Sequence, residues 1–269
     1  MILFTDLDGT LIYSHRRTGG REDMICVEHL NGKEQSYMTR GAYDMFCKER
    51  LCDVIPVTTR TIAQYSRLLD ALTLSDSGDA LVCNGAMLLH GSTEDMEWRK
   101  GSEALCAEDT PFLYKAYEDM KSYTDDEIIF EEPFMFYVRS SDPSAAYNYA
   151  STLADDHIRV YADARKVYFI PASLDKSAAV KRYISLTGET AYICAGDSTF
   201  DIDMLRSSGL SFASPAIADK VGDNAVICGD IMTDRMTEML RSIHIFGGSS
   251  AKDQLSIDTE GSYRWTISR

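Results

Sequence analysis

The stretch that decides the fold is residues 1–11, which run Met1-Ile2-Leu3-Phe4-Thr5-Asp6-Leu7-Asp8-Gly9-Thr10-Leu11. Its apolar half has no polar alternation, a pattern typical of a strand buried on both faces of a parallel sheet. Two carboxylates, Asp6 and Asp8, follow one residue apart, and a glycine and a hydroxyl come next. Open α/β sheets bind ligands at the carboxyl ends of their strands, so the stretch predicts a functional site directly after the first strand.

The length and composition are those of an ordinary globular protein. The 269 residues, 45% of them hydrophobic, suffice for one large domain or two moderate ones. No run approaches the roughly 18 apolar residues that cross a membrane. Because an apolar strand follows Met1 directly, with no charged leader before it, we expect a cytoplasmic protein.

The net charge of −15 argues against nucleic acid or an anionic membrane as the main partner, because both need a basic surface. It also repels any anionic ligand weakly. Attraction of such a ligand would therefore be local, from a metal ion, a lysine and backbone N–H groups.

The cysteines indicate neither a zinc site nor a disulfide framework, because they are scattered, odd in number and lack a Cys-x-x-Cys pair. We interpret them as buried thiols. They are Cys26, Cys47, Cys52, Cys83, Cys106, Cys194 and Cys228.

A second strand is predicted over residues 54–57, before Thr58, Thr59 and Arg60 and a helix over 62–72. A hydroxyl at this point can donate to a phosphate oxygen beside free helix N–H groups. Thr58 or Thr59 could equally be the N-cap of the helix. The residues alone favour the cap.

The strongest signal lies in residues 191–205, where an apolar strand ends in Gly196-Asp197 and a second carboxylate, Asp201, follows four residues later as a helix begins. Upstream, Lys176 opens another predicted helix, and its compact ammonium could hold carboxylate and phosphate charges together. Lys181, one turn further on, is the alternative, but we expect it on the surface.

These motifs, in this order, resemble those of the haloacid dehalogenase (HAD) superfamily of phosphatases and phosphotransferases. The matching elements are Asp6-Leu7-Asp8-Gly9-Thr10, Thr58, Lys176 and the Gly196-Asp197 to Asp201 spacing. Thr58-Thr59-Arg60 and the Asn84-Gly85 step resemble the subgroup with a C2-type cap, which includes Cof-like and sucrose-phosphatase-like proteins. The chain departs from that subgroup at Thr59, where glycine is usual, and at Phe200, where asparagine is usual; Asp203 matches no motif position.

The resemblance implies an α/β fold, a doubly wound parallel sheet (Rossmann-like HAD core) with an inserted α+β cap. We expect the core in residues 1–85 and 169–243, the cap in 86–168 and a tail or small hairpin in 244–269. Core hairpin strands are expected at 24–27 and 34–38, and the basic loop 14–21 is either a flap beside the site or a solvated loop. In the cap we expect a hairpin of 87–90 with 96–99, a helix over 103–123 interrupted near Pro111, a helix over 144–153, and strands over 134–139, 158–161 and 167–170.

The resemblance also implies a mechanism. Mg²⁺ would be held by Asp6, the backbone carbonyl of Asp8, and Asp197. Asp201 would not contact the metal but would orient a water or Lys176. Asp6 would be the nucleophile and Asp8 the acid/base group. Thr58 and Lys176 would offset charge on the transferred phosphoryl group. The predicted substrate contacts are Thr59, Arg60 and Asn84.

The predicted function is Mg²⁺-dependent hydrolysis of a small phosphorylated metabolite, with a sugar phosphate favoured. Arg139, Arg159, Arg165 and Lys166 are candidates for a second anionic group on the substrate. A dehalogenase would need no acid/base Asp8. A phosphomutase would share every core residue and stays open; an idle binding module would be expected to lose Asp6 or Asp197.

Overall fold

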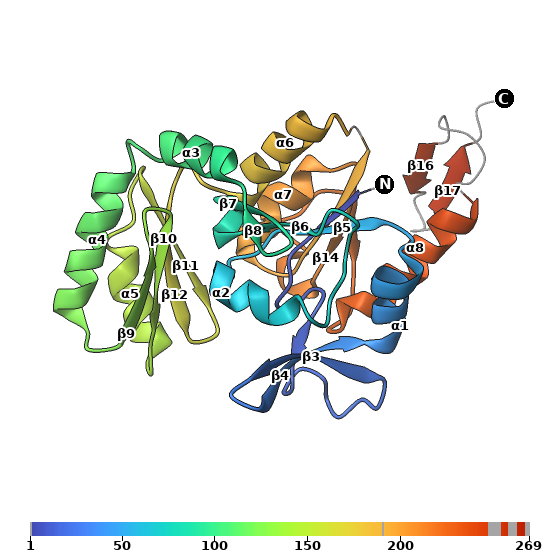
Figure 1. Ribbon diagram of the computed structural model, residues 1–269, viewed down its shortest axis with the longest axis horizontal. Helices are drawn as coiled ribbons and strands as arrows, with labels where there is room; N and C mark the ends of the chain where they lie inside the picture. The colour runs from blue at the N-terminus through green and yellow to red at the C-terminus, as the bar shows by residue number, and fades with distance from the viewer. Residues whose placement is uncertain (1, 190, 247–253, 258–262, 267–269) are drawn as a thin grey trace.

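The computed structural model describes residues 2–189, 191–246, 254–257 and 263–266. The chain forms an α/β core and, at its side, a smaller cap that follows β8 and precedes α6 (Figure 1). No helix in these ranges is long and apolar enough to cross a membrane.

The core is built on a parallel sheet whose centre is the N-terminal strand. β1 (Ile2–Thr5) lies between β13 (Tyr192–Gly196) and β5 (Asp53–Pro56). β14 (Leu210–Ala213) and β15 (Ala225–Ile227) extend the sheet beyond β13, also in parallel. The predicted fold class is confirmed.

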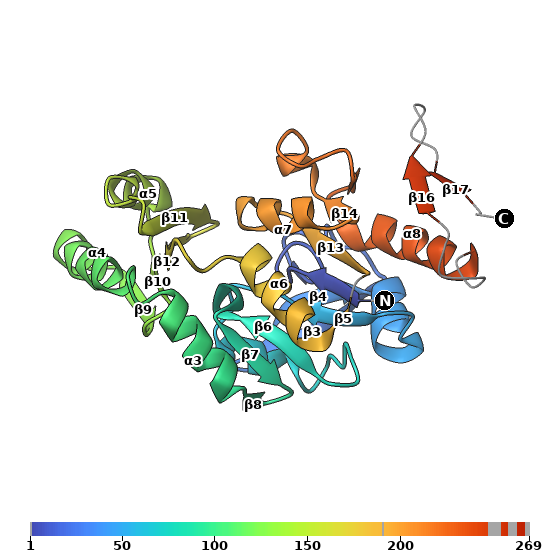
Figure 2. The same cartoon turned by 90° about the horizontal axis from the view of Figure 1, so that it is seen from above.

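Helices cover both faces of this sheet (Figure 2). Ile2 and Phe4 pack with α6 (Lys176–Thr187) and α7 (Ile202–Ser207) on one face. Leu3 points to the other face, toward α1 (Arg40–Tyr43), η1 (Asp44–Glu49) and α8 (Met232–Phe246). This double burial explains why β1 is apolar throughout.

Two smaller sheets flank the core. The predicted hairpin is β3 (Met24–Leu30) with β4 (Lys33–Thr39), paired in turn with β2 (Tyr13–Ser14). Its turn residues Asn31 and Gly32 have φ of 52° and 74°, as a two-residue hairpin turn requires. The helix expected over 62–72 is shorter, with α2 (Ile62–Tyr65) followed by η2 (Ser66–Leu68).

The hairpin expected from residues 87–90 and 96–99 is wrong. β7 (Met87–His90) pairs with β6 (Asp79–Val82) and β8 (Thr93–Glu94), and β6 adjoins β5 through a bridge from Leu81 to Val57. Residues 96–99 instead begin α3 (Met96–Leu105), because Asp95 caps the N–H groups of Glu97 and Trp98. We propose that the cap begins after β8, later than the boundary expected at residue 86.

The cap is a four-stranded antiparallel sheet with two helices on one face. The strand order is β11 (Ile158–Asp163), β12 (Lys166–Pro171), β10 (Met135–Arg139) and β9 (Glu127–Glu131). The helices are α4 (Thr110–Tyr123) and α5 (Pro143–Ser151). The single interrupted helix expected over 103–123 is two helices, because Pro111 sits in the first turn of α4. The prediction missed β9.

The opposite face of the cap sheet meets the core. The Tyr137 hydroxyl, from β10 of the cap, accepts a hydrogen bond of 2.8 Å from Gln64 Nε2 of the core. The Phe200 ring stacks on Tyr161 at 4.3 Å between centroids and meets Tyr168 edge-on at 5.4 Å. The departure at Phe200 therefore puts an aromatic contact between core and cap at this position.

Residues 244–269 include the end of α8 and an antiparallel pair, β16 (Gln254–Ile257) with β17 (Tyr263–Thr266). The remainder of the tail lies outside the described residues. The expectation that residues 244–269 form a tail or small hairpin apart from the core stays a prediction.

The Phe200–Tyr161 contact should contribute measurably to stability. We expect the double variant Phe200→Ala/Tyr161→Ala to lose less free energy of unfolding than the two single variants together, by about 0.5–1.5 kcal/mol, because stacked rings attract beyond their buried area. Urea unfolding of the four proteins measures this coupling. Additive losses would contradict it.

Candidate active site

The site forms where β1 and β13 end side by side. Thr5 pairs with Ala195 in the parallel register, and the Asp6 N–H donates to the Ala195 carbonyl at 2.9 Å. The first and fourth motifs therefore meet although they lie about 190 residues apart in sequence. Carboxylate oxygens of Asp6, Asp197 and Asp201 all lie within 4.8 Å of one another.

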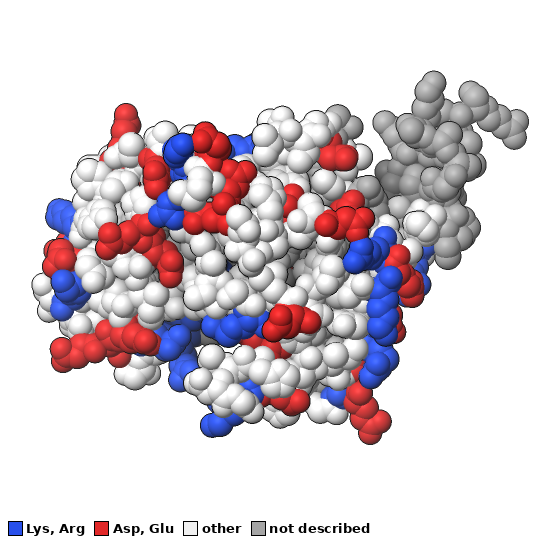
Figure 3. Space-filling view, viewed as in Figure 1, with Lys and Arg blue, Asp and Glu red and all other residues white. Residues whose placement is uncertain are grey.

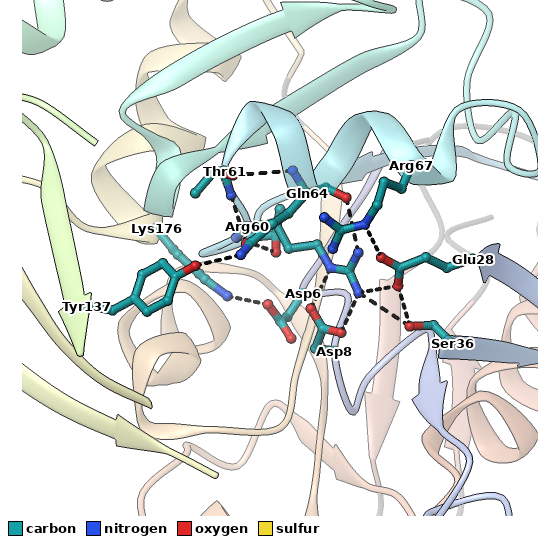
Figure 4. Close-up of polar contacts among 11 residues, drawn as sticks. Asp6, Asp8, Glu28, Ser36, Arg60, Thr61, Gln64, Arg67, Tyr137 and Lys176 are labelled. Atoms are coloured by element: carbon teal, nitrogen blue, oxygen red, sulfur yellow. Dashed lines mark hydrogen bonds and ion pairs between the residues drawn. The ribbon is translucent and has the colours of Figure 1, made fainter. Parts of the chain in front are cut away.

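Lys176 holds two of these carboxylates together. It is the first residue of α6 and only 1% exposed. Its Nζ donates to Asp6 Oδ1 at 2.6 Å (Figure 4) and also to Asp201 Oδ1 at 2.6 Å. Burial alone would lower the pKa of Lys176, but the charges of Asp201 and Asp6 raise it above its usual value. The lysine therefore stays an ammonium ion. Burial raises the pKa of Asp6 well above its usual range, with Lys176 acting in the opposite direction.

Asp201 has no free oxygen. Its Oδ1 accepts from Lys176, while its Oδ2 accepts from the N–H groups of Asp197 and Ser198 and from the Ser198 hydroxyl. A side chain at Gly196 would collide with Asp201, so glycine is required there. Asp201 thus holds Lys176 and the backbone of Asp197 in place, while the carboxylates of Asp6 and Asp197 are the ones available to bind a ligand.

The donor set fits a hard divalent cation. Burial and the charge of Asp201 raise the pKa of Asp197 to about 6, and Arg17 opposes this shift with a 2.9 Å hydrogen bond from its Nη1 to Asp197 Oδ2. Buried oxygen ligands with excess negative charge are what Mg²⁺ binds. We propose Asp6, Asp197 and the Asp8 carbonyl as its ligands. Sequence analysis assigned no role to Arg17. The one feature that could have indicated its role is its place in the basic loop 14–21, a candidate flap beside the site.

Asp8 lies at the exposed edge of the site in a network with Arg60. Its two oxygens accept from Arg60 Nη2 at 2.8 Å and Nε at 2.7 Å (Figure 4). Arg60 Nη2 also donates to Glu28 at 2.9 Å, and Arg67 Nε donates to the other Glu28 oxygen at 2.7 Å. The guanidinium of Arg60 thus holds Asp8, and the predicted contact of Arg60 with substrate stays a prediction. Sequence analysis missed Glu28.

The predicted threonines take different positions. Thr58 is 1% exposed, and its hydroxyl accepts from the Arg60 N–H at 3.1 Å. The N-cap of α2 is Thr61, which forms a capping box with Gln64, so the capping alternative favoured for Thr58 or Thr59 is wrong. The phosphate role of Thr58 and the substrate contact of Thr59 stay predictions.

Asn84 is buried and does not line the cavity that opens beside Asp8. Its Nδ2 donates to the Leu174 carbonyl at 3.3 Å, two residues before Lys176, and its backbone has a positive φ of 58°. This contact ties the end of β6 to the start of α6. The predicted substrate contact of Asn84 stays a prediction.

A cavity of about 330 Å³ opens beside Asp8 between core and cap. The core lines it with residues that include Thr59, Arg60, Gln64 and Arg67, and the cap lines it with residues that include Arg139, Asp163, Arg165, Lys166 and Tyr168. Arg159 does not line it and lies 3.9 Å from Asp175 instead. Lys181 does not line it either and is exposed, as expected.

No protein-family model and no curated protein matches the sequence. Solved structures match nearly the whole chain. A sucrose-phosphatase from Synechocystis, in complex with sucrose and phosphate, has a TM-score of 0.62 at 13% identity and covers 93% of this chain and 99% of its own. The chain has the HAD phosphatase fold. A sugar phosphatase of HAD subclass IIB gives 0.56 at 14% identity (91% and 99% covered), and a trehalose-6-phosphate phosphatase related protein gives 0.54 at 17% (92% and 98%). The resemblance to HAD proteins that the motifs indicated is therefore confirmed for the fold.

The Glu28 network predicts a pH-dependent stability. Burial would raise the pKa of Glu28, but hydrogen bonds and charges from Arg60, Ser36 and Arg67 lower it to about 2. The ionised carboxylate therefore stabilises the folded state above the pKa that Glu28 has in the unfolded chain. This stabilisation is lost as the pH falls from that pKa toward 2, the pKa in the folded state. Between pH 5 and 3 we expect wild-type protein to lose about 2 kcal/mol of unfolding free energy more than Glu28→Gln.

Urea unfolding at both pH values measures this difference. Glu118→Gln, which changes an exposed glutamate on α4, is the control and should follow wild type. Parallel losses in wild type and Glu28→Gln would show that the network does not hold the glutamate ionised.

Proposed function

We propose that this protein is a Mg²⁺-dependent phosphatase that hydrolyses a small phosphomonoester, a sugar phosphate, through an aspartyl-phosphate on Asp6. The observation that carries the proposal is the buried group of Asp6, Lys176 and Asp201 beside Asp197, because Asp6 lies two residues before Asp8, which lines the cavity. Sugar phosphatases are among the solved structures that share this fold, which supports the proposal.

The first step divides a difficult hydrolysis into two easier ones. A carboxylate oxygen of Asp6 attacks phosphorus, and the bond from phosphorus to the leaving oxygen breaks. Asp8, which faces the cavity, donates a proton to that oxygen so that an alcohol leaves. Arg60 holds Asp8 at the cavity wall and acts as a positioning residue.

The second step releases the enzyme. Asp8 takes a proton from water, whose oxygen attacks phosphorus and frees inorganic phosphate and the Asp6 carboxylate. The Lys176 ammonium and the Thr58 hydroxyl offset charge on the phosphoryl oxygens in both steps. Bound Mg²⁺ would neutralise charge on Asp6, Asp197 and the phosphoryl group.

The proposed setting is the cytoplasm, with a free metabolite as partner. All seven cysteines are free thiols, as a reducing compartment favours. The charge of −15 disfavours nucleic acid and anionic membranes as partners.

Phosphate release from p-nitrophenyl phosphate and a panel of sugar phosphates tests the proposal. We expect turnover with Mg²⁺ and its loss with excess EDTA. Interconversion of two monophosphates primed by a bisphosphate would establish a mutase instead. Absence of turnover with every substrate would favour a binding module.

Asp6→Asn should abolish turnover while the fold is kept, because an amide is nearly isosteric but a poor nucleophile. Lys176 keeps Asp201 as its partner in this variant. Initial rates and the thermal unfolding midpoint measure the two properties. Asp203→Asn is the matched control, since Asp203 is exposed on α7, and it should keep full activity.

Asp8→Asn should leave a slow enzyme. General acid–base catalysis contributes roughly 10²–10⁴-fold, so kcat should fall by about that factor while metal binding persists, because only the Asp8 backbone is a proposed ligand. Rate measurements and Mg²⁺ titration by calorimetry test both parts. A wild-type rate would exclude Asp8 as the acid/base group.

A further inference from the structure

The cavity beside Asp8 is basic although the protein is acidic. Five cations, Arg60, Arg67, Arg139, Arg165 and Lys166, line it, against the carboxylates of Asp8 and Asp163. Figure 3 shows Lys and Arg atoms gathered where the cap meets the core above the β3–β4 hairpin. In a chain with a net charge of −15, such a cluster marks a local preference for anions.

The core cations of this cluster are already engaged in part. Arg60 is held by Asp8 and Glu28. Arg67 uses its Nε for Glu28, and within the described residues its terminal nitrogens have no acceptor. Their engagement with Glu28 fixes both guanidinium groups at the cavity wall.

The cap cations of the cluster have weaker partners or none. Arg139 pairs with Glu127, and both side chains are about half exposed, so this pair contributes little. For Arg165 and Lys166 no carboxylate of the described part of the chain lies within ion-pair distance. The Lys166 ammonium lies over the Tyr137 and Tyr168 rings, 4.8 and 5.7 Å from their centroids, which orients it without neutralising it.

The leaving group of a phosphate ester would occupy this cavity. Asp8 is proposed to protonate the leaving oxygen, and Asp8 lines the cavity with Arg165 and Lys166. Arg165 lies in the turn that joins β11 and β12, and Lys166 is the first residue of β12; Arg67, in η2, lines the same cavity from the core. Asp8 and Asp163 offset only part of the charge of the five cations that line the cavity, and an anionic leaving group could pair with the remainder, whereas a neutral one could not.

We propose that the substrate is a phosphomonoester whose leaving group carries a second anionic group, a carboxylate or another phosphate, bound by Arg165, Lys166 and Arg67. This inference rests on the proposed phosphatase function and specifies its substrate class. Both anions match the fork of an arginine, so the experiment has one arm for each.

Each arm compares two substrates that differ in the second group. The carboxylate arm pairs 6-phosphogluconate with glucitol 6-phosphate, and the phosphate arm pairs glucose 1,6-bisphosphate with glucose 6-phosphate. We expect kcat/KM to be higher for the anionic member of at least one pair by roughly tenfold to a hundredfold, as for a charge-assisted hydrogen bond. The arm that shows the preference identifies the anion.

Arg165→Ala should reduce that preference by about tenfold. The readout is the ratio of kcat/KM within a pair, which cancels changes in the chemistry common to both substrates. Arg206→Ala is the matched control, because Arg206 is an exposed arginine of α7 outside the cavity, and it should keep the wild-type ratio. Lys166→Gln should lower the ratio in the same direction.

Equal kcat/KM values within both pairs would overturn the proposal. So would an Arg165→Ala variant that loses both members of a pair equally, since its charge would then serve the transferred phosphoryl group. If wild type hydrolyses no phosphate ester, the proposed function fails, and calorimetric binding of the same pairs to Asp6→Asn still decides the inference. Tighter binding of the anionic member, lost in Asp6→Asn/Arg165→Ala, would support it; equal binding would overturn it.

Discussion

The buried ammonium of Lys176 is the interaction on which the rest of the site depends. Asp6 and Asp201 are almost fully enclosed, and two carboxylates at this separation would repel each other without a cation between them. Removing one partner of a buried ion pair typically costs about 3–5 kcal/mol, so the three charges require one another. The triad also joins the ends of β1 and β13 to the start of α6, which binds three distant segments at one point.

A second network, around Arg60, positions Asp8 at the cavity as Lys176 positions Asp6. It links Asp8 at the exposed edge to Glu28 inside the β3–β4 hairpin. The hairpin is therefore part of the site architecture, because its buried glutamate holds the arginine that holds Asp8. The cap packs against the core on the other side of the cavity through the Phe200–Tyr161 and Gln64–Tyr137 contacts.

Much of the fold could be predicted because its signals are local. The apolar run before Asp6 and the Asn31-Gly32 turn both depend on residues close in sequence. The errors arose where local signals competed. Residues 96–99 are apolar enough for a strand, but Asp95 caps a helix there, and α3 and α4 are separate because Pro111 begins a new helix.

The sequence by itself determined the order of the motifs and which carboxylates follow apolar strands, because an apolar run and the residues after it are local features of the chain. The doubly wound core was predicted from the resemblance of those motifs to the HAD superfamily. Only the tertiary structure decided which charges meet. Arg17 reaches Asp197 and Glu28 reaches Arg60 across 180 and 32 residues, and Arg165 lines the cavity while Arg159, six residues earlier, does not. Such pairings depend on strand register and on how the cap is set against the core, which no short stretch encodes.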